Sequence, residues 1–322
     1  MTMPILDVKD LRLYYSTRAG PVRAVDRVSF QVEKGETLAL VGESGCGKTS
    51  IGISILRVLP RNVHTYDGHV IVEGEDVMKL SDSEFRKRIR WRKISMVFQG
   101  AMNALNPVIQ VGFQAAEPLM LHEGLDKEEA IRRVSELFRL VGLPEGIERR
   151  YPHELSGGMK QRVVIAMALV MKPSIVILDE PTSALDLMTQ ANIMNLLKDL
   201  KWEEGLTYIF ITHDLPLAAE LADKLAVMYS GRLVEVGTAE QIFFNPLHPY
   251  TKKLIAAVPT LREEKKLEWI PGTVPSLINP PPGCRFHPRC SEAMPVCSEE
   301  EPVMVEVEKG HFVACHLYSD KG

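Results

Sequence analysis

The chain has 322 residues, a formal net charge of −4 and 45% hydrophobic residues, a composition typical of a globular protein with one large or two smaller domains. This charge balance excludes a strongly basic nucleic-acid-binding surface. No stretch approaches the roughly 20 apolar residues that cross a bilayer, and we expect no signal peptide at residues 1–10. The longest apolar run, Val163–Met171, instead predicts a buried helix face.

The first elements in the chain prepare a phosphate-binding loop. Strands are expected over residues 5–15 and 25–32, and a third over the apolar run Thr37–Val41. The next eight residues, Gly42–Thr49, read GESGCGKT and fit the pattern G-x-x-x-x-G-K-[ST]. A periodic apolar stretch over residues 51–59 then predicts a helix. A strand, a glycine-rich loop and a helix in this order are the context that the motif requires.

Such a loop binds the phosphates of a nucleoside triphosphate. Its glycines let backbone N–H groups approach phosphate oxygens, and the helix that follows directs its positive end toward them. Lys48 is expected to reach the outer phosphates, and the hydroxyl of Thr49 to bind Mg²⁺. The residues expected to contact the nucleotide here are Gly42, Ser44, Gly45, Cys46, Gly47, Lys48, Thr49 and Ser50.

The middle of the chain alternates helices and strands. An amphipathic helix is expected over residues 126–141, with Asp126 as its N-cap and Glu129 three residues later. The continuous apolar runs at 174–178 and 207–212 predict strands that are buried on both faces. Strands that alternate with helices predict an α/β core with a parallel sheet.

Two acids follow the first of these buried strands. Asp179 and Glu180 end the segment SIVILDE. In phosphate-loop enzymes an Asp at this position holds Mg²⁺, usually through water. Glu180, one residue further, is then a candidate for polarising the water that attacks the γ-phosphate.

A second anion-binding site is predicted at Leu155–Gln161, which reads LSGGMKQ. Ser156, Gly157 and Gly158 precede a predicted helix, and a helix N-terminus attracts anions. The segment resembles the LSGGQ signature of ATP-binding cassette (ABC) proteins, with Met159-Lys160 altering its second half. The resemblance implies that this signature faces ATP held by an opposite subunit, so that two cassettes enclose the nucleotide.

The remaining cassette motifs occur in order, and their roles follow from the resemblance. Gln99 matches the glutamine that senses Mg²⁺, water and the membrane partner, and Ser183–Asp186 matches a loop that contacts the other cassette. His213 matches the switch histidine that stabilises the γ-phosphate. Tyr15 matches the aromatic residue that stacks on adenine, with Tyr14 as the alternative. Thr49, Gln99 and Asp179 would organise Mg²⁺, and Glu180, His213 and Gln99 would serve catalysis.

The C-terminal third resembles one branch of this family, the oligopeptide/dipeptide importers. The matching segments are His248–Thr251 (HPYT), Pro271–Leu277 (PGTVPSL) and Gly283–Cys290 (GCRFHPRC). The resemblance implies an ATPase that powers di- or oligopeptide import from the cytoplasmic face of the membrane as a peripheral subunit. Its expected partners are two transmembrane permease subunits, a second ATPase subunit (a homologue or another copy) and, indirectly, an external substrate-binding protein, with no nucleic acid.

Other functions stay open from the sequence. The same branch includes nickel and oligosaccharide importers, and a cassette ATPase uncoupled from transport is a further alternative. Two positions depart from the pattern: Gly100-Ala101 replaces the usual Asp-Pro after the glutamine, and Cys46 stands where Ser is commoner, with a thiol that could react with alkylating agents.

Four of the five cysteines lie near the C-terminus, with the spacing C-x5-C-x6-C-x17-C. This spacing lacks the C-x2-C pairs of zinc ribbons and the spacings of ferredoxins. The resemblance to peptide importers implies that Cys284, Cys290, Cys297 and Cys315 can hold a four-iron, four-sulfur (4Fe-4S) cluster. Zn²⁺ and free thiols are the alternatives.

The resemblance also implies the domain organisation. We expect an ABC-type ATP-binding domain over residues 1–260, with a parallel-sheet core, an antiparallel β subdomain and a helical subdomain at about 100–165. A proline-rich linker over 261–283 and a small Cys-rich appendage over 284–322 would complete this α/β chain.

Overall fold

The computed structural model describes residues 3–258, 270 and 272–321, and the chain divides into two compact units. Unit 1 combines Met1–Met78 with Phe210–Gly322, and unit 2 is Lys79–Ile209. The sequence-based boundaries at 260 and 283 remain predictions, and residues 259–269 and 271, within or beside the expected linker, lie outside the described residues.

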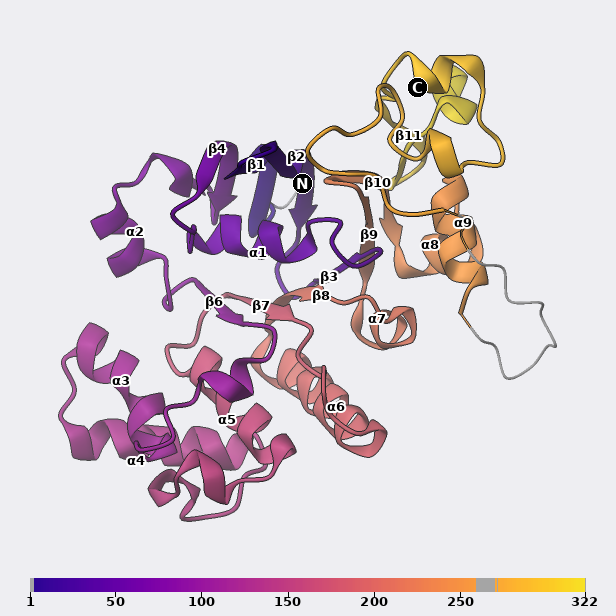
Figure 1. Cartoon of the computed structure of the whole chain (residues 1–322). Helices are drawn as coiled ribbons and strands as arrows, with labels where there is room; N and C mark the ends of the chain where they lie inside the picture. The colour runs from indigo at the N-terminus through magenta and orange to yellow at the C-terminus, as the bar shows by residue number, and fades with distance from the viewer. Residues whose placement is uncertain (1–2, 259–269, 271, 322) are drawn as a thin grey trace. The chain divides into compact units, whose positions relative to one another are not determined.

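Unit 1 contains an antiparallel four-stranded sheet in the order β2-β1-β4-β5 (Figure 1). In its register, Val8 of β1 lies opposite Phe30 of β2 and Val70 of β4. The apolar residues of β1 that alternate along the strand, such as Leu11 and Leu13, are fully buried, so this sheet has an apolar face. Its strands are β1 (Leu6–Thr17), β2 (Gly20–Val32), β4 (Val63–Val72) and β5 (Glu75–Asp76).

The same unit contains mixed pairing around the strand that leads into the phosphate loop. Strand β3 pairs in parallel with β9, and β10 pairs antiparallel with both β9 and β12. The five residues of β3 are all buried, as the unbroken apolar run predicts. The strands are β3 (Thr37–Val41), β9 (Lys224–Tyr229), β10 (Arg232–Thr238), β11 (Met304–Glu308) and β12 (His311–Ala314), and the helices are α1 (Lys48–Leu56), α7 (Leu215–Leu221), α8 (Ala239–Phe244) and α9 (Pro249–Ala256).

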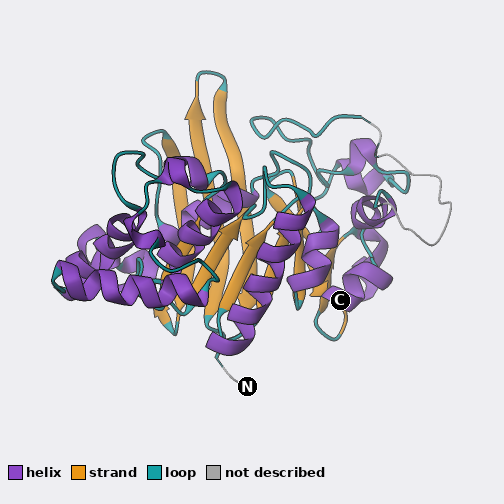
Figure 2. Ribbon diagram, turned by 90° about the horizontal axis from the view of Figure 1, so that it is seen from below, coloured by secondary structure: helices purple, strands orange, loops and turns teal. Residues whose placement is uncertain are grey.

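Unit 2 combines a parallel strand pair with a set of helices; Figure 2 colours all helices of the chain purple and all strands orange. Strand β6 (Ile94–Val97) pairs in parallel with β7 (Ile175–Asp179), and the strand β8 (Thr207–Ile211) spans the boundary between the units. The apolar run Val163–Met171 is largely buried and forms most of α5, as predicted. The helices are α2 (Asp82–Arg88), α3 (Val111–Glu123), α4 (Lys127–Leu140), α5 (Gly157–Leu169) and α6 (Leu187–Glu204).

Helix α4 shows how local signals define these elements. Asp126 caps it and accepts a hydrogen bond from the backbone N–H of Glu129 at 2.9 Å. Val134 and Phe138 of its apolar stripe are buried, and Gly142 ends the helix in a left-handed conformation with φ 71°. The cap and the apolar stripe were both predicted from the sequence.

The C-terminal part of unit 1 has regular structure that the sequence analysis did not anticipate. Strands β11 and β12 form a hairpin, and β12 continues the pairing to β10. Three short 3₁₀ helices accompany this hairpin: η5 (His287–Arg289), η6 (Pro295–Ser298) and η7 (His316–Lys321). Val313 of β12 is fully buried and packs with Leu247 and Cys315. The cysteine-bearing segment is therefore hydrogen-bonded to the body of unit 1.

Candidate functional site

The glycine-rich loop lies between β3 and α1, the position that its motif requires. Gly47 is the N-cap of α1 and has φ 110°, and Gly42 has φ 146°. A Cβ on Gly47 would come within 1.9 Å of the carbonyl oxygen of Ala24, and one on Gly42 within 2.2 Å of that of Met228. Both positions therefore need glycine for space as well as for backbone conformation.

Lys48 is folded back into this loop. Its Nζ donates hydrogen bonds to the carbonyl oxygens of Gly42 at 2.7 Å and of Glu43 at 3.1 Å. The side chain is buried, so its charge is held inside the turn, where phosphate oxygens are expected. Thr49 and Ser50 follow on the first turn of α1, and both are half-buried.

Cys46 is fully buried in the same loop. Burial raises the pKa of its thiol, although the ammonium of Lys48 opposes this shift. A thiol that is both inaccessible and protonated reacts slowly. The alkylation sensitivity expected from the sequence is therefore not favoured by this geometry.

Two tyrosines near the end of β1 have different surroundings. Tyr15 donates a hydrogen bond from its Oη to the Oγ of Ser50 at 3.0 Å, which ties it to α1. Tyr14 donates to Asp26 Oδ1 at 2.7 Å. Tyr15 is half-buried and beside the helix that begins at the phosphate loop, so it remains our predicted adenine-stacking residue.

The candidate catalytic acids follow β7 in unit 2. Asp179 is buried at the end of this strand, and Glu180 comes next with φ 46°, a left-handed conformation that is uncommon for a non-glycine residue. The Nε2 of Gln99 donates a hydrogen bond to Oε2 of Glu180 at 2.7 Å. The structure thus brings together two of the predicted catalytic residues, which are 81 positions apart in the sequence.

The signature segment begins α5 in the same unit. Ser156 is the N-cap, and its side chain accepts a hydrogen bond from the N–H of Met159 at 3.3 Å. Gly158 lies in the first turn of α5 and Thr189 in the first turn of α6. A Cβ on Gly158 would come within 2.7 Å of Cγ2 of Thr189, so the two helices begin close together. Asp186, the last residue of the predicted dimer-contact loop, caps α6.

His213 belongs to unit 1, where it is exposed in the turn between β8 and α7. Asp214 caps α7 by accepting a hydrogen bond from the N–H of Leu217 at 3.2 Å. The predicted site residues thus divide by unit. Unit 1 carries Tyr15, residues 42–50 and His213, and unit 2 carries Gln99, residues 156–158, Asp179 and Glu180.

The four C-terminal cysteines influence one another electrostatically. The pKa of the Cys315 thiol is raised to about 11, chiefly by burial, and charge on Cys284, Cys290 and Cys297 contributes to this rise. The N–H of Cys284 also donates to the carbonyl oxygen of Cys297 at 2.8 Å. Yet among the residues that the structure describes, no three His, Cys, Asp or Glu side chains converge as metal ligands. The predicted cluster is therefore not supported by the arrangement of these side chains.

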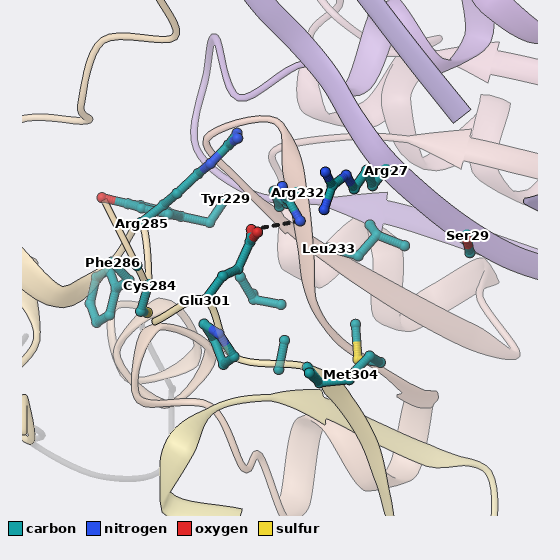
Figure 3. A pocket seen from close by; sticks show the side chains of 15 residues that line it. Arg27, Ser29, Tyr229, Arg232, Leu233, Cys284, Arg285, Phe286, Glu301 and Met304 are labelled. Carbon is teal, nitrogen blue, oxygen red and sulfur yellow. Dashed lines mark ion pairs between the residues drawn. The ribbon is translucent and has the colours of Figure 1, made fainter. Parts of the chain in front are cut away.

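A cavity of about 500 Å³ lies beside Cys284 in unit 1 (Figure 3). Its wall carries Arg232, which pairs with Glu301 at 2.6 Å and with Asp26 at 3.3 Å. Arg285, also in the wall, pairs with Asp26 as well, and its pKa is lowered mainly by burial. The arginines named here thus have acidic partners.

Sequence reasoning missed a set of contacts that reach the phosphate loop from the C-terminal part of unit 1. Arg289 pairs with Glu43, and the N–H of Glu43 donates to the Oη of Tyr250. Tyr250 and Arg289 were noticed only as parts of segments that match the family. No local pattern announces these long-range contacts.

Within the residues that the structure describes, every helix is too short or too polar to span a bilayer.

The comparisons with known proteins agree with this architecture. The family model of the ABC transporter matches residues 25–183, and that of the oligopeptide/dipeptide transporter C-terminal region matches residues 234–297. A relative from Caldanaerobacter subterraneus subsp. tengcongensis, the dipeptide transport ATP-binding protein DppD, is 46% identical over 98% of each chain. The oligopeptide transport ATP-binding protein OppD of Bacillus subtilis is 47% identical over 97% of this chain and 88% of its own.

Solved structures give the same fold. A dimeric ATP-binding cassette in a post-hydrolysis state, bound to ADP and phosphate, matches with a TM-score of 0.65 and 30% identity over 73% of this chain and 98% of its own. The full-length relatives, the two family models and the cassette fold lead to one conclusion. The chain belongs to the ABC transporter family, in the branch of ATP-binding subunits of oligopeptide and dipeptide transporters.

Proposed function

We propose that this chain hydrolyses ATP at the cytoplasmic face of the membrane to power the import of di- and oligopeptides. The observation that carries the proposal is the similarity to peptide transport ATP-binding proteins, at 46–47% identity over nearly the whole chain. As a member of this family, the chain is an ATPase coupled to transport. The similarity favours peptides over the nickel and oligosaccharide cargoes and over an ATPase without a transporter.

The phosphate loop supplies the first half of the nucleotide site. Lys48 and the amides of residues 42–47 would hold the phosphates, and close packing of Gly42 and Gly47 against the backbone of Met228 and Ala24 supports a fixed path for this loop. Thr49, Gln99 and Asp179 would hold Mg²⁺, which neutralises charge on the outer phosphates. Tyr15 would stack on the adenine.

Hydrolysis would depend on Glu180. Its contact with Gln99 orients the carboxylate, and the left-handed backbone at this residue is the kind of strain that persists at functional sites. A carboxylate so held can orient a water toward the γ-phosphate or accept its proton. His213 would stabilise the charge on the transferred phosphoryl group.

The signature segment would act on ATP held by another subunit. Ser156, Gly157 and Gly158 form the first turn of α5, where free N–H groups attract anions. ATP that contacts two cassettes favours their closed dimer, and hydrolysis removes that link. This cycle would drive two permease subunits, which receive peptide from an external binding protein. The second cassette is either a homologue or another copy of this chain.

The substitution Glu180→Gln tests the assignment of the catalytic acid. Loss of a general base lowers the rate by ~10²–10⁴-fold, whereas ATP affinity should persist because the phosphate loop is intact. Phosphate release and binding of a fluorescent ATP analogue measure the two quantities. Glu203→Gln, an exposed change in α6, is the matched control. Hydrolysis at the wild-type rate in Glu180→Gln would refute the role of Glu180.

We also propose that Cys284, Cys290, Cys297 and Cys315 hold a 4Fe-4S cluster. The support is the chemistry of the four thiols, since thiolates are the usual ligands of such clusters, and the backbone hydrogen bond that joins Cys284 to Cys297 at 2.8 Å. When bound, the group would tie η5, η6 and the end of β12 together covalently. No step of ATP hydrolysis depends on it.

The test is to purify the chain without oxygen and to measure iron, sulfide and zinc. We expect about four irons and four sulfides per chain. Cys290→Ser should lose this metal, whereas Cys46→Ser, a cysteine outside the group, should retain it. One zinc per chain, or no metal at all, would contradict the cluster.

A further inference from the structure

Arg289, in the short helix η5, makes a two-point contact with the phosphate loop. Its Nη1 donates to Oε2 of Glu43 at 2.8 Å, and its Nη2 donates to Oε1 of the same carboxylate at 3.1 Å. A guanidinium that meets a carboxylate through two parallel hydrogen bonds fixes the geometry of both groups. The arginine side chain is only 6% exposed and that of Glu43 is 25% exposed, so solvent screens this pair less than a surface pair.

Glu43 is held at its backbone as well as at its side chain. Its N–H donates to the Oη of Tyr250 at 2.9 Å, and its carbonyl oxygen accepts a hydrogen bond from Nζ of Lys48 at 3.1 Å. The same carbonyl oxygen accepts a hydrogen bond from the N–H of Cys46 at 3.3 Å. The side chain and the backbone N–H of Glu43 are therefore held from the C-terminal part of unit 1, and its carbonyl oxygen is held from within the loop.

The residues that make these attachments are themselves rigidly packed. The rings of Tyr229, Tyr250 and Phe286 form a cluster with centroid separations of 4.7, 5.2 and 5.4 Å. All three side chains are almost fully buried. Arg289 also donates to the Oη of Tyr229 at 3.2 Å. This cluster joins η5 and α9 to the end of β9, so movement of the cysteine-bearing segment is coupled to Glu43.

The charge of Glu43 matters for the ligand. A carboxylate next to the phosphates of ATP repels them, since like charges in a partly buried setting interact strongly. The guanidinium of Arg289 compensates that charge while it fixes the side chain. Loss of Arg289 would leave a free carboxylate in the loop and remove one of the supports of its backbone.

We propose that Arg289 is a positioning residue for ATP: through Glu43 it fixes the phosphate loop and neutralises a carboxylate beside the bound phosphates. The cysteine-bearing segment thereby sets the ATP affinity of the phosphate loop, although Arg289 and Glu43 are 246 residues apart in the sequence. This inference rests on the proposed role of residues 42–49 in binding ATP.

The test measures the dissociation constant of a fluorescent ATP analogue with Mg²⁺ on the full chain. In Arg289→Ala we expect affinity to fall by ~10-fold, the size of effect that loss of a charged hydrogen-bonded pair produces. Arg289→Lys keeps the positive charge but loses the two parallel hydrogen bonds to Glu43, so its affinity for the analogue should fall by ~3-fold. Steady-state kinetics should show the change in KM for ATP, with kcat altered much less.

The double variant Arg289→Ala/Glu43→Gln separates compensation of the Glu43 charge from general destabilisation. Removing the repelling carboxylate should restore affinity to within ~3-fold of wild type, because the two residues act as a coupled pair. Lys224→Ala, which breaks the ion pair with Glu36 in the same unit, is the control and should keep wild-type affinity. If Arg289→Ala does not fold, the affinity of Arg289→Lys for the ATP analogue is measured instead.

The outcomes distinguish this inference from the proposed nucleotide site. Loss of ATP binding in Lys48→Ala, together with unchanged affinity in Arg289→Ala or Arg289→Lys, would overturn the inference and leave the site. Unchanged binding in Lys48→Ala would overturn the site itself. Equal weakening in the single and double Arg289→Ala variants would assign Arg289 a merely structural role.

Discussion

In the candidate nucleotide site, single residues act through close steric contacts and short hydrogen bonds. Gly47 is the clearest case, because a side chain there would collide with the backbone of a neighbouring strand. Gln99 and Glu180 are another, because one hydrogen bond at 2.7 Å fixes the orientation of the carboxylate. The motifs predicted that these residues take part in the site, but neither the close approach to Ala24 nor the hydrogen bond between Gln99 and Glu180, because both depend on tertiary structure.

The substitution Gly47→Ala should abolish ATP binding and destabilise the fold. The new Cβ would lie 1.9 Å from the carbonyl oxygen of Ala24, so the loop or β2 must move. The left-handed conformation alone costs ~1–2 kcal/mol for a residue with a side chain. Gly35→Ala is the control, because Gly35 has φ 78° but open space around its Cβ position. Thermal unfolding and nucleotide titration measure both effects.

The control should lose stability by about the conformational cost alone and keep its affinity for ATP. Wild-type affinity in Gly47→Ala would mean that the loop tolerates a different path, which would contradict the steric argument.

At the scale of elements, sequence patterns predicted those parts of the fold whose signals are local. The apolar run of β7 and the capped, striped helix α4 are examples, since burial and capping depend on neighbours in the chain. The hairpin of β11 and β12 was missed, because MVEVE and HFVA are only five and four residues long. The contact between Arg289 and Glu43 was missed because only tertiary structure creates it.

A buried hydrogen-bonded group joins β10, β12 and the start of α9. Glu235 accepts hydrogen bonds from the N–H groups of Leu247 and His248 at 2.7 and 2.9 Å, and its Oε1 lies 2.8 Å from Nε2 of His311. The Nδ1 of His248 accepts from the N–H of Tyr250 at 3.0 Å. These contacts fix the segment that carries Tyr250 to the phosphate loop.

This group predicts a loss of stability in mild acid. Burial lowers the pKa of His248 from 6.5 to about 4, so the unfolded chain binds a proton at a pH where the folded chain does not. Stability from this residue is complete above pH 6.5 and falls as the pH decreases toward 4, by on the order of 3 kcal/mol. Denaturant unfolding at pH 7.5 and pH 5 measures the difference.

The variant His248→Asn keeps an acceptor for the N–H of Tyr250 and removes the titration. It should therefore show a flatter pH profile than the wild type. His64→Asn changes an exposed histidine and should leave the profile unchanged. If the free energy of unfolding of His248→Asn changes with pH as steeply as that of the wild type, the acid sensitivity comes from other groups.

At the scale of the whole molecule, we predict two different anion sites in the chain, the phosphate loop at 42–49 and the signature at 156–158. If each ATP contacts the loop of one subunit and the signature of another, the two sites complement each other between chains. A solved relative by fold is a dimeric cassette, which favours this arrangement. The sequence predicted it only through the family signature, because no local pattern specifies a contact between subunits.

A mixing experiment tests the arrangement. Lys48→Ala removes the loop function and Ser156→Arg obstructs the signature, so each variant alone should be inactive. In a mixed dimer both defects fall in one site, and the other site combines an intact loop with an intact signature. Random pairing in equal amounts should then regain about a quarter of the wild-type sites. ATPase activity against mixing ratio measures the regain. With both variants folded, no regain at any ratio would exclude pairing between copies of this chain, and the second cassette would have to be a homologous subunit.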